Sequence, residues 1–233
     1  SQEKRFEKEA QSMTQKPLEE EQIQLFFSDI EPLAVSKVLI LLEKENLSIG
    51  ERVLAQELQL TVRGQEKIGI IGPNGVGKST LLAKLHQLLS GKREISLGFM
   101  PQDYQETLQL DLSPVEFLSQ TGHKEEIQKI QSHLASLNFS YPEMHHQIYS
   151  LSGGQQGKLL LLNLVLRKPN FLLLDEPTRN FSPTSQPEIR KLFATYPGGL
   201  VTVSHDRRFL KEVCTSIYSL TEHGLKVVDL QDL

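Results

Sequence analysis

The sequence predicts an α/β domain built around a mostly parallel β-sheet, and three observations carry this prediction. Phe171–Leu174 and Leu200–Val203 are apolar runs without alternation, as expected of strands that are covered on both faces. Lys67–Ile71 is a short apolar run that leads directly into glycines, and leucines at helical spacing follow those glycines. The length of 233 residues suits one such domain with an appendage.

The first half of the domain alternates strands with a helix. Val38–Leu42 and Val53–Val62 are predicted strands, the second with partial alternation of apolar and polar residues. Ile95–Met100 is a further predicted strand. Between these strands a helix is expected after the glycine-rich loop, because apolar residues there recur at helical spacing: Leu81, Leu82, Leu85, Leu88 and Leu89.

The second half of the domain contains an expected helical lobe, at about residues 103–166. Ser113-Pro114-Val115-Glu116 has the pattern of a helix start, with an N-cap serine, a proline at the first position and a glutamate that closes a capping box. Two helices are expected within 113–138, and a third after Gly154. Short strands near Ser216–Leu220 and Leu225–Val228 are predicted to close the chain.

Residues 1–36 differ from the rest in composition and are predicted to be a linker or arm, with the main domain at 38–233. Ser1–Gln22 is charged and rich in glutamine, and Phe6, Ala10 and Met13 recur at the spacing of a weakly amphipathic helix. A solvated linker helix and the end of an inter-domain arm both fit this pattern.

Composition narrows the possible functions. The net charge is −4, whereas proteins that grip nucleic acid with their own surface are usually basic, so no direct DNA binding is expected. The longest apolar runs, Val38–Leu42 and Leu159–Leu162, are much shorter than a transmembrane segment, and no signal peptide is evident, so we expect a cytoplasmic protein. The single cysteine, Cys214, is expected to be a small buried residue.

Gly72–Ser79 carries the pattern of a phosphate-binding loop, two glycines separated by four residues and followed by lysine and serine. The glycines allow successive backbone N–H groups to point at phosphate oxygens, and the following helix adds its positive end. Lys78 is expected to reach the β- and γ-phosphates and Ser79 to bind Mg²⁺. The alternative is a turn that binds nothing. The predicted cofactor-binding residues here are Gly72, Pro73, Asn74, Gly75, Val76, Gly77, Lys78, Ser79 and Thr80.

Two acids follow the apolar run Phe171–Leu174. The carboxyl ends of parallel strands are where α/β sheets bind ligands. Asp175 is therefore a candidate Mg²⁺ ligand, and Glu176 a candidate general base for an attacking water. The alternative is an ordinary strand end followed by a polar turn.

Leu151-Ser152-Gly153-Gly154-Gln155 precedes an apolar helix. Its serine and glycines are expected to offer backbone N–H groups and a helix N-terminus to an anion, and the alternative is a plain serine N-cap. The order of motifs, from the phosphate loop through Gln102, this LSGGQ segment and Asp175-Glu176 to His205, resembles that of the ABC ATPases over about 38–233.

This resemblance implies an ABC-type P-loop NTPase domain with a mostly parallel core sheet, an antiparallel β subdomain and a small inserted helical lobe. It implies that the cofactors are ATP and Mg²⁺, that Gln102 contacts the metal and the water, and that His205 contacts the γ-phosphate. It also implies that a second ABC domain receives Ser152, Gly153, Gly154 and Gln155 at its nucleotide. One chain then carries two half-sites and hydrolyses ATP only when paired.

Asp175–Asn180 and Ser204–Leu210 are similar to motifs of the ABC-F group, whose members act on the ribosome as translation factors or in antibiotic ribosomal protection. The alternative is the ATPase subunit of a membrane ABC transporter. Two positions depart from the family pattern. Ser182 stands where the D-loop usually has aspartate, and Ile49 stands near the position of the aromatic residue that stacks on adenine. We therefore expect a weak preference for ATP over GTP.

Overall fold

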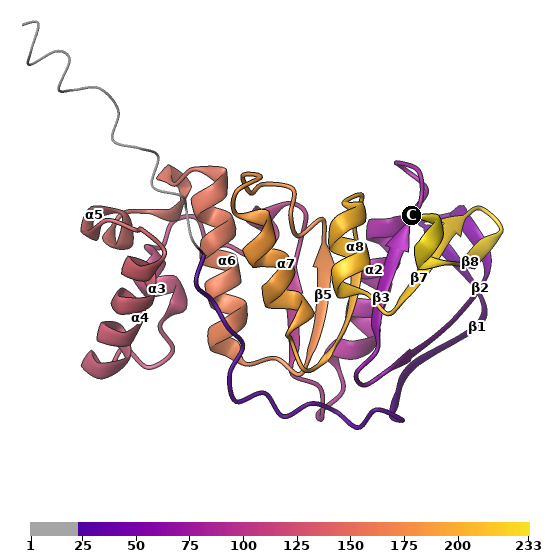
Figure 1. Ribbon diagram of the computed structural model, residues 1–233, viewed down its shortest axis with the longest axis horizontal. Coiled ribbons are helices and arrows are strands. Elements are labelled where there is room, and N and C mark those ends of the chain that lie inside the picture. The colour runs from indigo at the N-terminus through magenta and orange to yellow at the C-terminus, as the bar shows by residue number, and fades with distance from the viewer. Residues whose placement is uncertain (1–22) are drawn as a thin grey trace, which may run out of the picture.

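The computed structural model describes residues 23–233, and a six-stranded sheet forms their centre (Figure 1). From β4 to β7 neighbouring strands are parallel, and β8 joins the edge antiparallel to β7. The prediction of a mostly parallel core sheet is therefore confirmed. In sheet order the strands are β4 (Leu97–Met100), β5 (Phe171–Asp175), β6 (Gly199–Val203), β3 (Lys67–Ile71), β7 (Ser216–Thr221) and β8 (Gly224–Val228).

A separate antiparallel hairpin, β1 (Val38–Ile49) and β2 (Arg52–Arg63), forms the predicted β subdomain. The expected end of the first strand at Leu42 is wrong, because the strand continues for seven residues to Ile49. This continuation is mostly polar and exposed, and its register shifts where Lys44 adopts a left-handed φ of 54°. Such a bulge breaks the alternation by which a sequence reveals a strand. The strand predicted at Ile95 also begins later, at Leu97.

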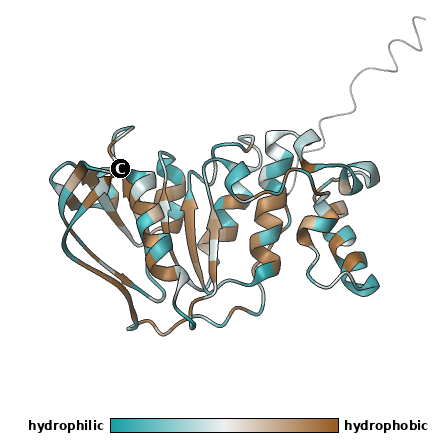
Figure 2. Ribbon diagram, turned by 180° about the vertical axis from the view of Figure 1, so that it is seen from behind, coloured by the Kyte–Doolittle hydropathy of each residue, from teal (hydrophilic) through white to brown (hydrophobic). Residues whose placement is uncertain are grey.

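Helices cover both faces of the sheet. Helix α2 (Lys78–Ser90) packs its leucines between the hairpin and one face, which also receives Phe171 and Leu173 of β5. The alternate residues of β5 belong to the core on the opposite face, with α6 (Gly153–Arg167), α7 (Gln186–Ala194) and α8 (Arg207–Val213). In Figure 2 the hydrophobic colour follows the central strands and parts of these helices. This burial on both faces explains the unbroken apolar strands.

The helical lobe lies at the end of the molecule opposite the hairpin (Figure 1). It contains α3 (Pro114–Leu118), α4 (Lys124–Ser136) and α5 (Tyr141–His145), with 3₁₀ turns at Tyr104–Glu106 and Ile148–Ser150. The expected capping box of Ser113 and Glu116 is present. Helix α6 leaves the lobe and runs along the sheet. A last 3₁₀ turn spans Leu230–Asp232.

The segment before β1 lies against the α6–α7 side of the domain. Ile23 and Leu25 are buried in that core, and the ring of Phe27 lies 4.7 Å from the ring of Tyr196. Asp29 pairs with Lys168 at 3.3 Å. The predicted domain boundary near residue 37 stays a prediction, and the helix expected from Phe6, Ala10 and Met13 falls outside the described residues.

Two smaller expectations can also be compared with the structure. Cys214 is buried beside α8, as expected of a small core residue. Within residues 23–233, no helix combines the length and the apolar character that crossing a membrane requires.

Candidate nucleotide-binding site

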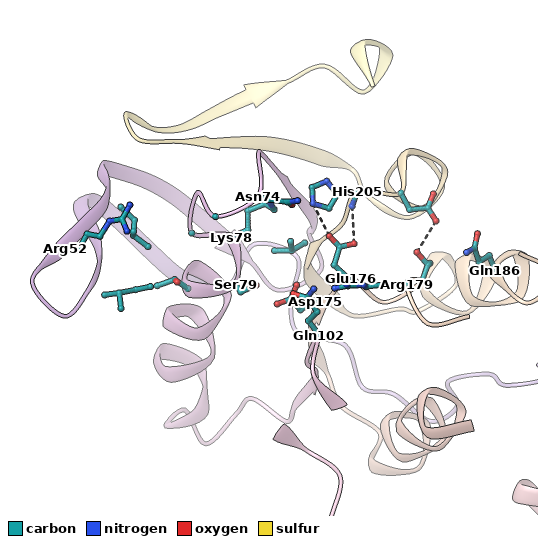
Figure 3. A pocket seen from close by; sticks show the side chains of 18 residues that line it. Arg52, Asn74, Lys78, Ser79, Gln102, Asp175, Glu176, Arg179, Gln186 and His205 are labelled. Atoms are coloured by element: carbon teal, nitrogen blue, oxygen red, sulfur yellow. Dashed lines mark hydrogen bonds and ion pairs between the residues drawn. The ribbon is translucent and has the colours of Figure 1, made fainter. Parts of the chain in front are cut away.

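A cleft of about 860 Å³ opens at the carboxyl ends of β3, β5 and β6 (Figure 3). Its walls come from the loop before α2, from the ends of β5 and β6, and from the tip of the β1–β2 hairpin. Ten of the predicted site residues line it: Asn74, Gly75, Gly77, Lys78, Ser79, Thr80, Gln102, Asp175, Glu176 and His205. Gly72, Pro73 and Val76 belong to the same loop without lining the cleft, and Ser152–Gln155 do not line it either.

The loop before α2 has the backbone of an anion cradle. Gly77 is the N-cap of α2 with a left-handed φ of 114°, and no side chain caps the helix. A Cβ atom at Gly77 would lie 3.0 Å from the Leu54 side chain, so the position favours glycine for both space and conformation. The first N–H groups of α2 are therefore free of side-chain caps and available to an anion.

Lys78 completes this loop. Its Nζ donates hydrogen bonds to the backbone oxygens of Gly72 at 2.7 Å and of Pro73 at 2.8 Å, so the side chain folds over the loop. Burial lowers the pKa of Lys78, while the carboxylates of Glu176 and Asp175 oppose that shift. The ammonium thus lies where the loop and the two acids meet.

Asp175 lies at the end of β5 with 6% of its surface exposed. Its Oδ1 is buried without a hydrogen-bond partner among the described residues. Burial raises the pKa of this carboxyl, and the Ser79 hydroxyl and the charges of Lys78 and Arg179 oppose the rise. An orphaned carboxylate oxygen beside a hydroxyl is a donor set that suits Mg²⁺, so these two residues fit the predicted metal.

Glu176 is held in an unusual backbone conformation. Its φ is 50°, a left-handed value, and its N–H donates to the oxygen of Val203 at 2.8 Å. Its Oε2 accepts from the N–H of His205 at 3.2 Å, and its Oε1 lies 3.4 Å from His205 Nε2. Burial raises the pKa of Glu176, against hydrogen bonding to His205. The result is an oriented and more basic carboxylate at the cleft.

Several cleft residues were not predicted from the sequence: Arg52, Leu54, Thr178, Arg179, Gln186, Val203 and Asp206. Thr178 and Arg179 directly follow the two acids, which is a signal the sequence did offer. The Thr178 hydroxyl donates to Asp206 Oδ2 at 3.1 Å. Arg52 follows Ile49 at the hairpin tip, and Ile49 itself lines the cleft as expected from its position.

The LSGGQ segment forms the N-terminus of α6. The Ser152 hydroxyl accepts from the N–H of Gln155 at 3.2 Å, and Gln155 Oε1 accepts from the N–H of Ser152 at 3.1 Å. Gln155 Nε2 also donates to Glu143 Oε1 of α5 at 2.8 Å. The alternative of a serine N-cap is thus present as a full capping box. A role of these residues at another domain's nucleotide stays a prediction.

Ser182 follows the Asp175–Asn180 turn and is engaged locally. Its hydroxyl lies 2.9 Å from that of Thr184 and 3.1 Å from that of Ser185. Its backbone oxygen accepts from the N–H groups of Ser185 and Gln186 at the start of α7. Ser182 therefore stabilises the turn into α7 within its own chain, and its effect on pairing remains a prediction.

This chain is similar to a known protein family and to several known proteins. A family model described as ABC transporter matches residues 55–179. "Probable ATP-binding protein YheS" of Escherichia coli is 30% identical over 87% of this chain and 33% of its own length. "ABC transporter F family member 2" of Arabidopsis thaliana is 28% identical over 97% of this chain and 34% of its own length. The chain therefore spans about a third of the length of these relatives.

Among solved structures, the dimeric post-hydrolysis state of the ATP-binding cassette MJ0796 bound to ADP and Pi superposes with a TM-score of 0.66. It shares 19% sequence identity, and the match covers 83% of this chain and 97% of the other. At this identity the likeness concerns the fold, and it confirms the predicted combination of a core sheet, an antiparallel subdomain and a helical lobe.

Proposed function

This chain belongs to the ABC transporter family, and we propose that it binds Mg-ATP in the cleft and hydrolyses it when paired with a second ABC domain. One observation carries the proposal: a single cleft collects the phosphate loop, the buried Asp175 and the Glu176–His205 pair. An uncapped helix N-terminus, a lysine and two carboxylates in one place suit a nucleoside triphosphate with its metal.

The predicted site residues of the cleft have distinct roles in this proposal. The N–H groups of the loop and Lys78 hold the phosphates. Ser79 and Asp175, with Gln102 as the resemblance implies, would hold Mg²⁺, which neutralises charge between the β- and γ-phosphates. Glu176 accepts a proton from a water whose oxygen attacks the γ-phosphorus.

The bond between the γ-phosphorus and its bridging oxygen then breaks, and ADP leaves with that electron pair. His205 lines the cleft and its Nε2 lies 3.4 Å from Glu176 Oε1, which suits its proposed contact with the γ-phosphate.

The proposal that this chain pairs with a second ABC domain rests on the position of Ser152–Gln155. Since this segment does not line the cleft of its own chain, we propose that it completes the nucleotide site of a second domain. The test measures equilibrium binding of ATP and steady-state turnover over a range of chain concentrations, with and without an added ABC domain. We expect ATP binding at all concentrations and a turnover per chain that rises with pairing. Absence of Mg-ATP binding would overturn the proposal.

At the level of the whole protein, we propose a cytoplasmic ABC-F factor that acts on the ribosome, either in translation or in antibiotic ribosomal protection. Similarity to an ABC transporter F family member supports this assignment, as do the motifs at Asp175–Asn180 and Ser204–Leu210. The alternative is the ATPase subunit of a membrane transporter, which the description of the matching family model favours.

Ribosome sedimentation separates these two functions. We would use the full-length parent protein with Glu176→Gln, which is expected to hold ATP without cleaving it, and the same protein with Lys78→Ala as a control that lacks nucleotide. Co-sedimentation that requires ATP and is absent in the control supports the ribosomal function. An ATP-loaded protein that stays in the supernatant would favour the transporter subunit.

A further inference from the structure

A second cation besides Lys78 faces the phosphate end of the cleft. Arg179 lines the cleft together with Lys78 and Glu176, and Figure 3 shows its side chain beside Asp175 and Glu176. Among the described residues, no hydrogen bond or ion pair engages its guanidinium group. Its charge is nevertheless close enough to oppose the rise in the pKa of Asp175. Arg179 is thus an exposed, uncommitted cation next to two carboxylates.

The backbone that carries Arg179 is held at several points. The N–H of Arg179 donates to the oxygen of Glu176 at 3.1 Å, which closes the turn after β5. The N–H of Phe181 donates to the oxygen of Thr178 at 3.3 Å, and Thr178 is 3% exposed. With the Thr178 hydroxyl on Asp206, this turn has a fixed orientation relative to the candidate base. The backbone of Arg179 is therefore held in a fixed position at the rim of the cleft.

The position of the reacting phosphate follows from the two walls of the cleft. In the proposed reaction, the amides before α2 and Lys78 hold the phosphates from one side. Glu176 accepts a proton from a water on the opposite side of the γ-phosphorus. Arg179 lines the cleft beside Glu176 (Figure 3), so in the proposed reaction its guanidinium would approach the γ-phosphoryl group from the side of Glu176. A planar guanidinium binds phosphate oxygens in pairs, which a lysine cannot do.

We propose that Arg179 is a catalytic residue that binds the γ-phosphoryl group held on the loop of its own chain and stabilises the charge on that group during hydrolysis. This inference rests on the proposed ATP hydrolysis. Water oxygen bonds to the γ-phosphorus, its proton passes to Glu176, and the electron pair of the broken bond leaves with ADP. Negative charge is spread over the equatorial oxygens in this step, and Arg179 supplies the matching positive charge there.

The test compares Arg179→Ala and Arg179→Lys with wild type in turnover, in ADP affinity and in trapping of ADP with orthovanadate, which mimics the transferring phosphoryl group. We expect Arg179→Ala to lower kcat by about 100-fold or more and to lose vanadate trapping, while KM and ADP affinity change by less than about threefold. Arg179→Lys should recover part of kcat. Arg208→Ala, an exposed arginine that contacts Glu212 and does not line the cleft, is the matched control.

Two results would overturn this inference, and a third would overturn the proposed function on which it rests. Wild-type turnover in Arg179→Ala would mean that the guanidinium takes no part in the reaction. An equal loss of affinity for ADP alone and for ADP with vanadate would assign Arg179 to ground-state binding or to support of Asp175. Failure of the wild-type chain to bind nucleotide would overturn the proposed function itself. Normal hydrolysis by wild type together with equal hydrolysis by Arg179→Ala would overturn this inference alone.

Discussion

The N-termini of α2 and α6 both follow glycine- and serine-containing motifs, yet they are built differently. Helix α2 begins at a left-handed Gly77 with no side-chain cap. Helix α6 begins at Ser152 with a capping box that occupies the N–H groups of Ser152 and Gln155. Helix α2 therefore has N-terminal N–H groups that are available to a ligand. In α6, side chains of the same helix start already accept from some of the N-terminal N–H groups.

Under the proposed function, the two helix N-termini would contact phosphate in different ways. The α2 site is completed within the chain by Asp175 and Glu176 at the adjoining strand end. The α6 terminus is a preformed surface, held to the lobe by the hydrogen bond from Gln155 to Glu143. Such a surface can present Ser152 to a nucleotide bound elsewhere, and it does so without rearranging its own helix start.

Lys78→Ala tests the first site and has the largest expected effect. Removing the ammonium leaves the phosphates without their nearest cation and releases its bonds to Gly72 and Pro73, so nucleotide affinity should fall by about 100-fold or more. Calorimetric titration with Mg-ATP measures this loss. Lys84→Ala is the control, since Lys84 lies on the same helix but pairs with Glu45 outside the cleft. Unchanged affinity in Lys78→Ala would remove the phosphate loop from the site.

Ser152→Asp tests the second site. Aspartate caps helices as well as serine does, so thermal stability should stay near wild type, whereas Ser152→Ala should lose about 1 kcal/mol. A carboxylate facing a partner's phosphate is repelled, so turnover of the paired domain should fall by about tenfold or more. Ser140→Asp, at the equivalent capping box of α5, controls for charge and capping. Full turnover in Ser152→Asp would separate α6 from the nucleotide.

Ile49 tests the part of the α2 site where the adenine of the nucleotide is expected to lie. Its side chain lines the cleft and is 58% exposed, but it has no aromatic face to stack on adenine. Competition titrations should give wild type similar affinities for ATP and GTP. Ile49→Tyr should raise ATP affinity by about tenfold through stacking, whereas Leu41→Tyr on the same strand should not. Strong adenine selectivity in wild type would contradict this prediction.

Glu126 tests the stability of the helical lobe itself, at the turn before α4, with the smallest expected effect. Hydrogen bonds, first from the N–H of Gln120 and then from Thr121, lower the pKa of Glu126 to about 2. Because the pKa is lower when folded than when unfolded, the carboxylate contributes stability above the unfolded pKa of about 4.5, and this contribution is lost as pH falls toward 2. Denaturation at neutral pH should therefore show Glu126→Gln to be less stable than wild type, with a gap that narrows toward pH 3.

Glu125→Gln is the matched control for this measurement, because Glu125 precedes Glu126 on α4 and is exposed, whereas the N–H groups of the Gln120–Gly122 turn donate to Glu126. A gap between Glu126→Gln and wild type that is the same at both pH values would show that the charge of Glu126 is not what stabilises the turn at Gln120–Gly122.

The gathering of Lys78, Asp175 and His205 at one cleft could be predicted because these residues follow strand ends. Lys78, Asp175 and His205 come after β3, β5 and β6, and parallel pairing brings those ends to one edge of the sheet. Arg179 and Arg52 were not predicted as cleft residues, although Arg179 closely follows the two acids in the sequence. Their participation depends on how a turn and a hairpin tip are placed in space, and an exposed arginine leaves no periodic pattern in a sequence.

Helix α7 and the end of β1 were also missed, for different reasons. Ile189, Leu192 and Phe193 of α7 are buried at helical spacing after a proline in the first turn, so the signal was present but short. The second half of β1 is a mostly exposed edge with a bulge at Lys44, where hydrophobic periodicity does not operate. For these elements, packing in the folded domain determines the structure where the local sequence pattern does not.

The most direct measurement follows the fate of ATP bound to Glu176→Gln beside the wild-type protein in its paired state. We expect the variant to retain ATP affinity within about threefold and to hold the nucleotide uncleaved, with turnover lower by about 10²- to 10⁴-fold, because the amide cannot accept the proton of the attacking water. Glu222→Gln, an exposed acid outside the cleft, should behave as wild type. Full turnover in Glu176→Gln would contradict the assignment of Glu176 as the base.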